Sequence, residues 1–236
     1  MKSKIFKAST LCAALSLLSL EGQAQDKIEV EVGADLVSSY IWRGQDSGGF
    51  SVQPSIAVNY RGFSLGAWGS VGFDKEDDKE IDLSLAYTYK GFSVSVTDYW
   101  YAYYGEKNSY FKYGAHSTSH QYEAQLGYDF DVVSVNWYTV FAGADGVKPN
   151  GKRAYSSYIQ LTAPFKLGGI DWSAEVGATP WETDFYEDAT GFAVCDVSLS
   201  ASKEIPITSS FHLPLFAKFT FNPASEGAYA TFGMSF

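Results

Sequence analysis

The stretch DLVSSYIWRGQDSGGFSVQPSIAVNYRGFSLGAWGS, residues 35–70, decides the fold. Apolar residues occupy every second position on both sides of a tight turn at residues 60–62. That row consists of Phe50, Val52, Pro54, Ile56, Val58 and Tyr60, then Phe63, Leu65, Ala67, Gly69 and Val71. The row between them is mostly small or polar. A period of two is typical of β-strands, whose successive side chains point to opposite faces. The stretch therefore predicts strands with one apolar and one polar face.

The same pattern repeats to the end of the chain and predicts twelve strands. Each of them can supply the roughly 9–11 residues that a tilted strand needs to cross a membrane. The expected ranges are 27–43, 50–61, 63–73, 80–90, 92–102, 118–130, 132–143, 154–167, 169–179, 191–203, 207–221 and 226–236.

The connections alternate in length along the chain. Those after the even-numbered strands are short: 61–62, 90–91, 129–132, 166–169 and 205–208. Those after the odd-numbered strands are mostly longer: 44–49, 74–79, 103–117, 144–153, 180–190 and 222–225. Outer-membrane barrels have short periplasmic turns, longer extracellular loops and an even strand count. The sequence thus predicts a twelve-stranded antiparallel transmembrane β-barrel with both termini on the periplasmic side.

The N-terminus has the features of a secretory signal peptide. Three lysines precede the apolar run Leu11–Leu20, and Gly22-Gln23-Ala24 forms a cleavage site of the small-x-small kind. The run is too short to span a bilayer as a helix. We expect residues 1–24 to be removed, which leaves one barrel domain over residues 25–236. Cys195 is then the only cysteine, so an internal disulfide is excluded.

Composition narrows the classes of partner. The formal net charge is −10, and loss of a signal peptide with three lysines and one glutamate makes it −12. Nucleic-acid binding needs a basic surface, so nucleic acid is not expected as a partner. The mean hydropathy of −0.12 suits a barrel, because lipid-facing and lumen-facing residues average out. Outside the leader, no apolar run is long enough for a transmembrane helix.

Aromatic residues near the strand ends predict girdles at the two membrane interfaces. The candidates are Tyr40, Trp42, Tyr60, Tyr87, Tyr89, Tyr128, Tyr155 and Trp172. The last strand ends on Phe236, in one row with Phe232 and Met234. A terminal Phe on an alternating strand resembles the signal by which bacterial outer-membrane barrels engage their assembly machinery.

Four positions depart from the pattern. Pro54, Pro164 and Pro214 lie inside predicted strands, where each removes a hydrogen bond, so we expect bulges or bends there. Asp98 falls in an outward row, where a charge is costly at mid-depth and cheap near an interface. Either the strand bulges nearby or Asp98 lies near the rim, and the sequence does not choose between the two.

The opening stretch also resembles a known family. Ser39-Tyr40, Arg43-Gly44, Gln53-Pro54, Gly62, Gly66 and Trp68-Gly69-Ser70 are similar to the corresponding positions of the TorF-type family of small outer-membrane porins. The match covers about the first three strands closely, and the rest agrees in length, topology and terminal Phe. The resemblance implies a small bacterial outer-membrane barrel, but it supplies no substrate.

Twelve strands lie between the eight whose side chains fill the interior and the 16–18 that leave an aqueous channel. We therefore expect a narrow or loop-constricted pore for ions or small polar solutes. The lumen-facing ionisable candidates are Asp35, Arg43, Asp82, Glu123, Asp171, Glu175, Asp196 and Lys218, with Glu31 and His212 as further members. Most are acidic, which predicts a mild cation preference if the pore is open. The equal alternative is a closed interior in which these charges pair with one another.

Other functions were weighed against the channel. His116 to His120, followed by Glu123, supplies the residue types of an outer-membrane lipid hydrolase, but alternation places His120 and Glu123 on opposite faces. The Tyr-rich segment 103–113 could make a non-conducting barrel an adhesion platform. A soluble periplasmic sandwich or lipocalin-like carrier would not explain the alternating loops. We expect no enzyme activity, no cofactor and no metal. The acidic segment 74–80 lacks the glycine spacing of a calcium loop and suits a solvated tip.

Overall fold

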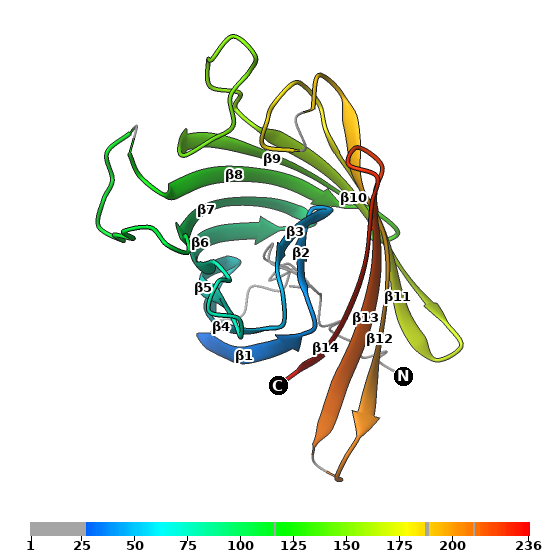
Figure 1. Cartoon of the computed structure of the whole chain (residues 1–236). Coiled ribbons are helices and arrows are strands. Elements are labelled where there is room, and N and C mark those ends of the chain that lie inside the picture. The colour runs from blue at the N-terminus through cyan, green and yellow to red at the C-terminus, as the bar shows by residue number, and fades with distance from the viewer. Residues whose placement is uncertain (1–26, 116, 187–188, 210) are drawn as a thin grey trace.

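The computed structural model describes residues 27–115, 117–186, 189–209 and 211–236. The predicted signal peptide therefore lies outside the described residues. The described residues contain fourteen strands and no helix that could span a bilayer (Figure 1). The strands are β1 Glu29–Val37, β2 Tyr40–Trp42, β3 Gln45–Gly48, β4 Ser51–Tyr60, β5 Phe63–Gly72, β6 Lys79–Tyr89, β7 Phe92–Ala102, β8 His120–Asp129, β9 Ser134–Gly143, β10 Ser157–Leu167, β11 Ile170–Thr179, β12 Ala193–Pro206, β13 His212–Asn222 and β14 Gly227–Ser235.

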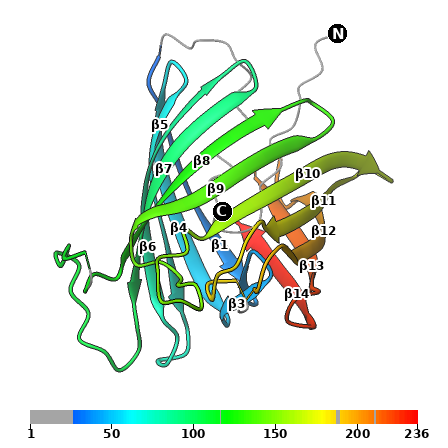
Figure 2. The ribbon, with the colours of Figure 1, turned by 90° about the horizontal axis from the view of Figure 1, so that it is seen from above.

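Twelve of these strands form a closed antiparallel barrel in the order β1-β14-β13-β12-β11-β10-β9-β8-β7-β6-β5-β4. This confirms the predicted twelve-stranded antiparallel barrel. In Figure 2 the two-residue turns after β4 and β6 lie at one end of the barrel, and the longer loops after β7 and β13 lie at the other. We call these the short-turn end and the long-loop end.

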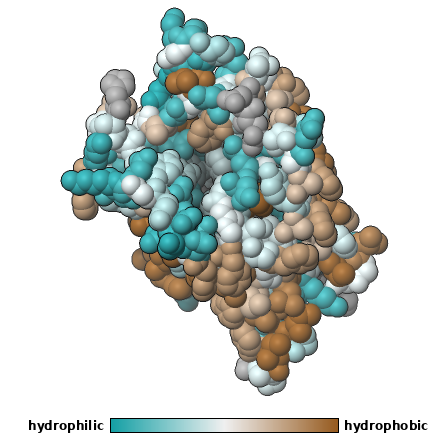
Figure 3. Space-filling model, in the orientation of Figure 1, coloured by the Kyte–Doolittle hydropathy of each residue, from teal (hydrophilic) through white to brown (hydrophobic). Residues whose placement is uncertain are grey.

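The wall has an apolar outer row and a polar inner row. In β6, Ile81, Leu83 and Leu85 are exposed on the outside, whereas Asp82 and Ser84 are buried inside. The same alternation runs through β4, β5, β7 and β13. Figure 3 shows hydrophilic residues around a central hollow and hydrophobic ones over the outer wall near β12 and β13. This distribution of polarity is the reverse of that in a water-soluble globular protein.

The first predicted strand is shorter than expected. It was predicted to run over residues 27–43, but β1 ends at Val37. Ser38 ends it by accepting the Phe232 amide at Oγ (2.9 Å), while its own amide donates to the Phe232 carbonyl (2.8 Å). The chain then turns inward as the separate hairpin β2–β3, which crosses the barrel interior (Figure 1). Tyr40 and Trp42 are therefore buried in the lumen, and their assignment to an aromatic girdle was wrong.

A bulge or a bend was expected at each of the three prolines, and no register shift occurs at any of them. Pro164 pairs with Ser173 in unbroken register, and Pro214 pairs in the same way with Glu204. Because neighbouring strands differ in length, β9 stops pairing with β10 at Thr162, and β14 first pairs with β13 at Leu215. Both prolines thus occupy strand ends that are paired on one side only, where a missing amide donor is tolerated.

Pro54 is accommodated in a different way. The β4–β5 pairing lapses between Val52 and Ser55, but it resumes in the same register. The register shifts of the barrel lie elsewhere, between Tyr122 and Glu123 in β8 and between Gly177 and Ala178 in β11.

The barrel closes through a short seam. β1 and β14 share three residue pairs, Asp35–Ser235, Leu36–Met234 and Val37–Gly233. Beyond them, the backbone of Phe236 exchanges two hydrogen bonds with Ala34, at 3.0 and 3.2 Å. By contrast, β1 pairs with β4 along its whole length. The seam is therefore the least extensively paired junction of the barrel wall.

Candidate functional site at the lumenal hairpin

The hairpin β2–β3 turns at Arg43 and Gly44, whose φ angles are 49° and 81°. Two successive positive φ angles are typical of a type I′ turn, which suits the right-handed twist of a hairpin. The same geometry occurs at Arg61-Gly62 (49° and 85°) and Lys90-Gly91 (47° and 81°), which join wall strands at the short-turn end. A basic residue followed by glycine is thus the recurrent two-residue turn of this chain.

The tip of the hairpin is fitted against the opposite wall of the barrel. A Cβ atom on Gly44 would lie 1.8 Å from the carbonyl oxygen of Cys195 in β12. Asn222 of β13 donates from Nδ2 to the Gly44 carbonyl oxygen at 3.1 Å. Cys195 is fully buried, as expected for a small hydrophobic residue, and packs with Tyr40 and Trp42. Only glycine fits this position, for both its backbone angle and its closeness to β12.

Arg43 forms the centre of a buried polar network. Its guanidinium makes two parallel hydrogen bonds with Glu123 of β8, from Nη1 to Oε2 at 2.7 Å and from Nη2 to Oε1 at 2.8 Å. Nη1 also donates to the hydroxyl of Tyr186 at 2.6 Å, and the Tyr99 hydroxyl donates to Glu123 Oε1 at 3.0 Å. Charge-assisted bidentate pairs of this kind are the strongest hydrogen bonds that side chains make.

Aromatic rings enclose the same guanidinium. Its central carbon lies 4.4 Å from the ring centre of Trp42, 4.2 Å from that of Tyr138 and 4.7 Å from that of Tyr158. Burial lowers the pKa of Arg43, but the interactions with Glu123, Tyr186 and Tyr99 together outweigh burial, and the pKa lies well above its ordinary value. Arg43 is therefore a permanent cation, held by one carboxylate and several ring faces.

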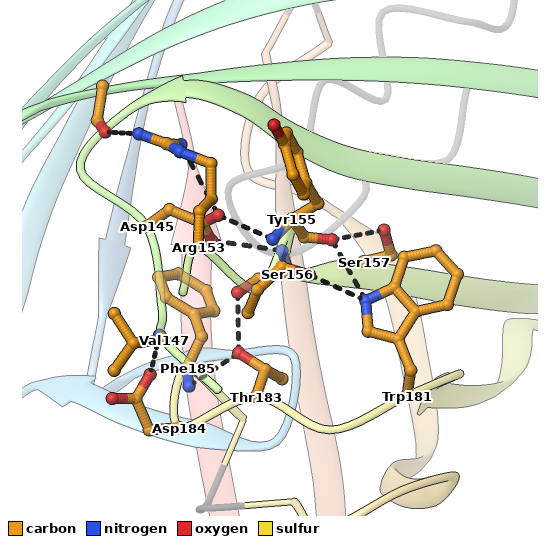
Figure 4. Close-up of polar contacts among 12 residues, drawn as sticks. Asp145, Val147, Arg153, Tyr155, Ser156, Ser157, Trp181, Thr183, Asp184 and Phe185 are labelled. Carbon is orange, nitrogen blue, oxygen red and sulfur yellow. Dashed lines mark hydrogen bonds and ion pairs between the residues drawn. The ribbon is translucent and has the colours of Figure 1, made fainter. Parts of the chain in front are cut away.

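Hydrogen bonds join the β9–β10 loop to the β11–β12 loop, which carries Tyr186 (Figure 4). Ser156 and Thr183 share a hydrogen bond between their hydroxyls at 2.7 Å, and Asp184 accepts the Val147 amide at 2.6 Å. Trp181 donates from Nε1 to the carbonyls of Ala154 (3.1 Å) and Tyr155 (3.2 Å). The β9–β10 and β11–β12 loops are thus bonded into one unit at the long-loop end.

Asp145 strengthens this unit from within the β9–β10 loop. Its carboxylate accepts the amides of Tyr155 (2.8 Å) and Ser156 (3.1 Å) and faces the Arg153 guanidinium at 3.5 Å. Burial raises the pKa of Tyr186 above its ordinary value, although Arg43 opposes this, so Tyr186 remains a neutral phenol at the tip of the hairpin. The hairpin is therefore locked from two sides, by the wall and by the loops.

The eight residues predicted to face the lumen separate into several groups. Arg43 and Glu123 form the central pair, and Lys218 Nζ lies 3.3 Å from Glu175 Oε1. Both predicted lumenal cations thus have a carboxylate partner, as a paired interior would require. Asp196 is fully buried in β12, where it bonds to Ser198 and lies beside Glu175 and Lys218, so it belongs with the second pair. The remaining three lie elsewhere: Asp82 is beside Glu80 in β6, Asp171 is 2.6 Å from Lys166 near the short-turn end, and Asp35 is in the seam strand. Glu31 is half-buried in β1, and His212 is exposed at the start of β13.

Sequence reasoning missed several partners of this site. Tyr99, Tyr138, Tyr158 and Tyr186 contact Arg43 or Glu123, and none was singled out. Glu80 was assigned to a solvated loop tip, yet it is 5% exposed and points into the lumen. A usable signal existed in Arg43-Gly44, because it matches the hairpin turns at 61–62 and 90–91. Treated as a turn, it predicts a hairpin at that point.

His120 and Glu123 lie on opposite faces of β8, as alternation predicted. Glu123 faces the lumen, whereas His120 lies on the outer side and bonds from Nδ1 to Asp98 Oδ1 at 2.8 Å. Its Nε2 lies 2.5 Å from the Tyr110 carbonyl oxygen, beneath the rings of Tyr110 and Tyr113. Nε2, the nitrogen that would have to face a serine in a Ser-His-acid arrangement, thus faces a backbone carbonyl oxygen instead. His116 lies outside the described residues.

Asp98 therefore has a role that the sequence left undecided. No register shift occurs at Asp98 in β7, and its pairing with Tyr122 and Leu83 is regular. The residue lies four positions from the long-loop end of β7, where it ties the Tyr-rich segment 103–113 to the outer wall through His120.

No protein-family model matches this chain, and neither does any curated protein with which it was compared.

Proposed function

We propose that this chain is a bacterial outer-membrane protein that forms a narrow, cation-preferring channel for ions or small polar solutes. The observation that carries the proposal is the inside-out polarity of a closed barrel: an apolar outer row and a polar lumenal row. In water the outer row would be costly, whereas in a bilayer it matches the hydrocarbon. The proposal places the short turns and both termini in the periplasm, and Phe236 in contact with the assembly machinery. We also propose, from the resemblance of residues 39–70, that the chain belongs to the TorF-type family of small outer-membrane porins.

The lumenal hairpin supports a narrow pore. Its tip reaches from the β1–β4 side to β8 and β12, so solutes would have to pass around Arg43 or move it. Between the hairpin and the short-turn end the lumen remains hydrophilic. There Gln125 donates to Ser93 at 2.9 Å and to Asn136 at 2.8 Å. A polar lumen with one constriction is the arrangement expected of a small selective channel.

The lumenal charges support a preference for cations. Five carboxylates line the long-loop half of the lumen, against two cations, Arg43 and Lys218. The carboxylates are Glu80, Asp82, Glu123, Glu175 and Asp196. An excess of fixed negative charge raises the local concentration of cations and lowers that of anions.

Single-channel recording tests this proposal. The mature chain, refolded and inserted into a planar bilayer, should give discrete conductance steps, and a salt gradient should shift the reversal potential toward cation selectivity. Substitution of Arg43 should change the step size, because Arg43 lies at the constriction. A fully inserted but silent barrel would refute the channel.

A second function deserves the same experiment. The hairpin residues Tyr40, Ile41, Trp42 and Arg43 are all at least 93% buried, which favours a filled, non-conducting barrel. Such a barrel would act through its outer loops, in particular the Tyr-rich segment 103–113, as a structural or adhesion platform. Silence of the inserted native protein, combined with conductance once the hairpin is removed, would support this second function.

A further inference from the structure

Glu80 and Asp82 form a second lumenal feature, separate from the Arg43–Glu123 pair. They stand two positions apart in β6 and therefore face the lumen side by side. Glu80 is 5% exposed and Asp82 is 6% exposed. The two carboxyl groups lie within hydrogen-bonding reach of each other, an arrangement that one proton held between them would stabilise. Two buried carboxylates without such a proton would repel each other strongly.

Each of these carboxyl groups keeps one buried oxygen without a partner. Glu80 Oε1 and Asp82 Oδ1 have no hydrogen-bond partner among the described residues. Unpaired buried acceptors are rare, because the free energy lost when the group leaves water is then not recovered by a hydrogen bond in the protein. The unpaired oxygens therefore indicate that the site accepts a donor or a cation from the lumen.

Aromatic side chains flank the pair on the neighbouring strands. Asp82 lies opposite Trp68 in β5 and Tyr99 in β7, and Glu80 lies opposite Tyr101 in β7. From the hairpin, Tyr40 packs against Trp68 with ring centres 5.6 Å apart, and its hydroxyl bonds to Glu80. Carboxylates combined with the faces of Trp and Tyr are the groups that bind ammonium ions.

We propose that Glu80, Asp82 and these four aromatic residues form a binding site for a small alkylammonium cation. A divalent metal fits less well, because the described residues contain no group of three or more His, Cys, Asp or Glu side chains that could hold one. The bound cation would take the place of a proton between the two carboxyl groups: its N–H groups donate to the free oxygens, and any proton held there leaves to water. This inference rests on the proposed channel, because the bound cation would be a solute that passes through the lumen.

Binding can be measured without conductance. We would record saturation transfer from the refolded protein to the methyl protons of methylammonium, in deuterated detergent micelles. The native protein should give a saturable signal, and Glu80→Gln combined with Asp82→Asn should weaken binding at least tenfold. Asp171→Asn is the matched control, because Asp171 faces Lys166 near the short-turn end, and it should leave binding unchanged.

Three results would overturn the inference: no saturable signal from folded native protein, equal binding by the double variant, or displacement of methylammonium by Ca²⁺ at far lower concentration than by K⁺. Heat-modified gel mobility verifies folding, and the single Asp82→Asn variant replaces the double one if the latter misfolds. A silent barrel that binds methylammonium would refute the channel alone. A conducting barrel that does not bind it would refute this site alone.

Discussion

At the scale of single residues, the stability of the lumenal hairpin depends on the Arg43–Glu123 ion pair. Glu123→Gln would leave a buried guanidinium without its counter-charge, and loss of one partner of a buried pair costs about 3–5 kcal/mol. We expect the free energy of unfolding, measured by tryptophan fluorescence in denaturant, to fall by that amount. The hairpin should also detach more readily, which would appear as fluctuating conductance.

Two comparisons identify the cause of that loss. Arg43→Met combined with Glu123→Met removes both charges, and we expect it to recover much of the stability, because well-packed apolar residues can replace a buried pair. Asp171→Asn disrupts the more exposed pair with Lys166 and should cost about 0–1 kcal/mol. Equal losses for Glu123→Gln and Asp171→Asn would contradict the burial argument.

Gly44 offers a test of the steric fit between the hairpin and β12. Gly44→Ala and Gly105→Ala both place a side chain at a positive φ, 81° and 74°, which costs about 1–2 kcal/mol. Only Gly44→Ala also creates a clash, because Gly105 has no atom within 4 Å of the added carbon. The clash should add about 1–3 kcal/mol in denaturant unfolding. If the two variants were equally stable, the hairpin tip would not be pressed against Cys195.

At the scale of elements, the hairpin is removable without breaking the wall. Val37 and Ser51 are directly paired between β1 and β4, so a short Gly-Ser linker can join the strands in place of residues 40–48. We expect this variant to fold as a barrel and to conduct with a larger step than the native protein. The measurement is single-channel conductance beside a heat-modified gel. An unchanged step size would show that the hairpin is not the constriction.

The same element shows where sequence reasoning succeeds and where it fails. The wall strands could be predicted because one face is apolar and the other polar over nine or more residues, as in β4 and β6. Alternation could not reveal the hairpin, because β2 and β3 are three and four residues long, and Tyr40, Ile41 and Trp42 are all buried. Its one signal in the sequence is the Arg43-Gly44 turn. The lumenal position of Glu80 was missed for a related reason, because its acidic neighbours suggested a solvated loop.

The partners of the site residues were beyond the sequence for a topological reason. Arg43 and Glu123 are 80 positions apart, and Arg43 and Tyr186 are 143 apart. Which inward residues meet across a lumen depends on strand tilt, register and the path of the hairpin. Alternation gives the face on which a side chain lies, but not its height or its partner.

At the scale of the whole molecule, the seam depends on Phe236. Its backbone makes two hydrogen bonds to Ala34, which are worth about 0.5–1.5 kcal/mol each. Deletion of Phe236 should therefore lower the unfolding free energy in detergent, whereas Phe236→Ala, which keeps the backbone, should lower it less. Both variants should assemble poorly in cells if the ring is the signal for the assembly machinery. Normal assembly of Phe236→Ala would contradict that role.

The path of the hairpin also has a consequence for the order of folding. Its tip contacts β8, β12 and β13, whose contact residues follow it in sequence by 80 to 178 positions. A hairpin with so many bulky rings would have difficulty entering a finished cylinder, whereas an open curved sheet can wrap around it. The hairpin would then act as a template that sets the curvature of the sheet. The three pairs between the first and last strands would be the last to form.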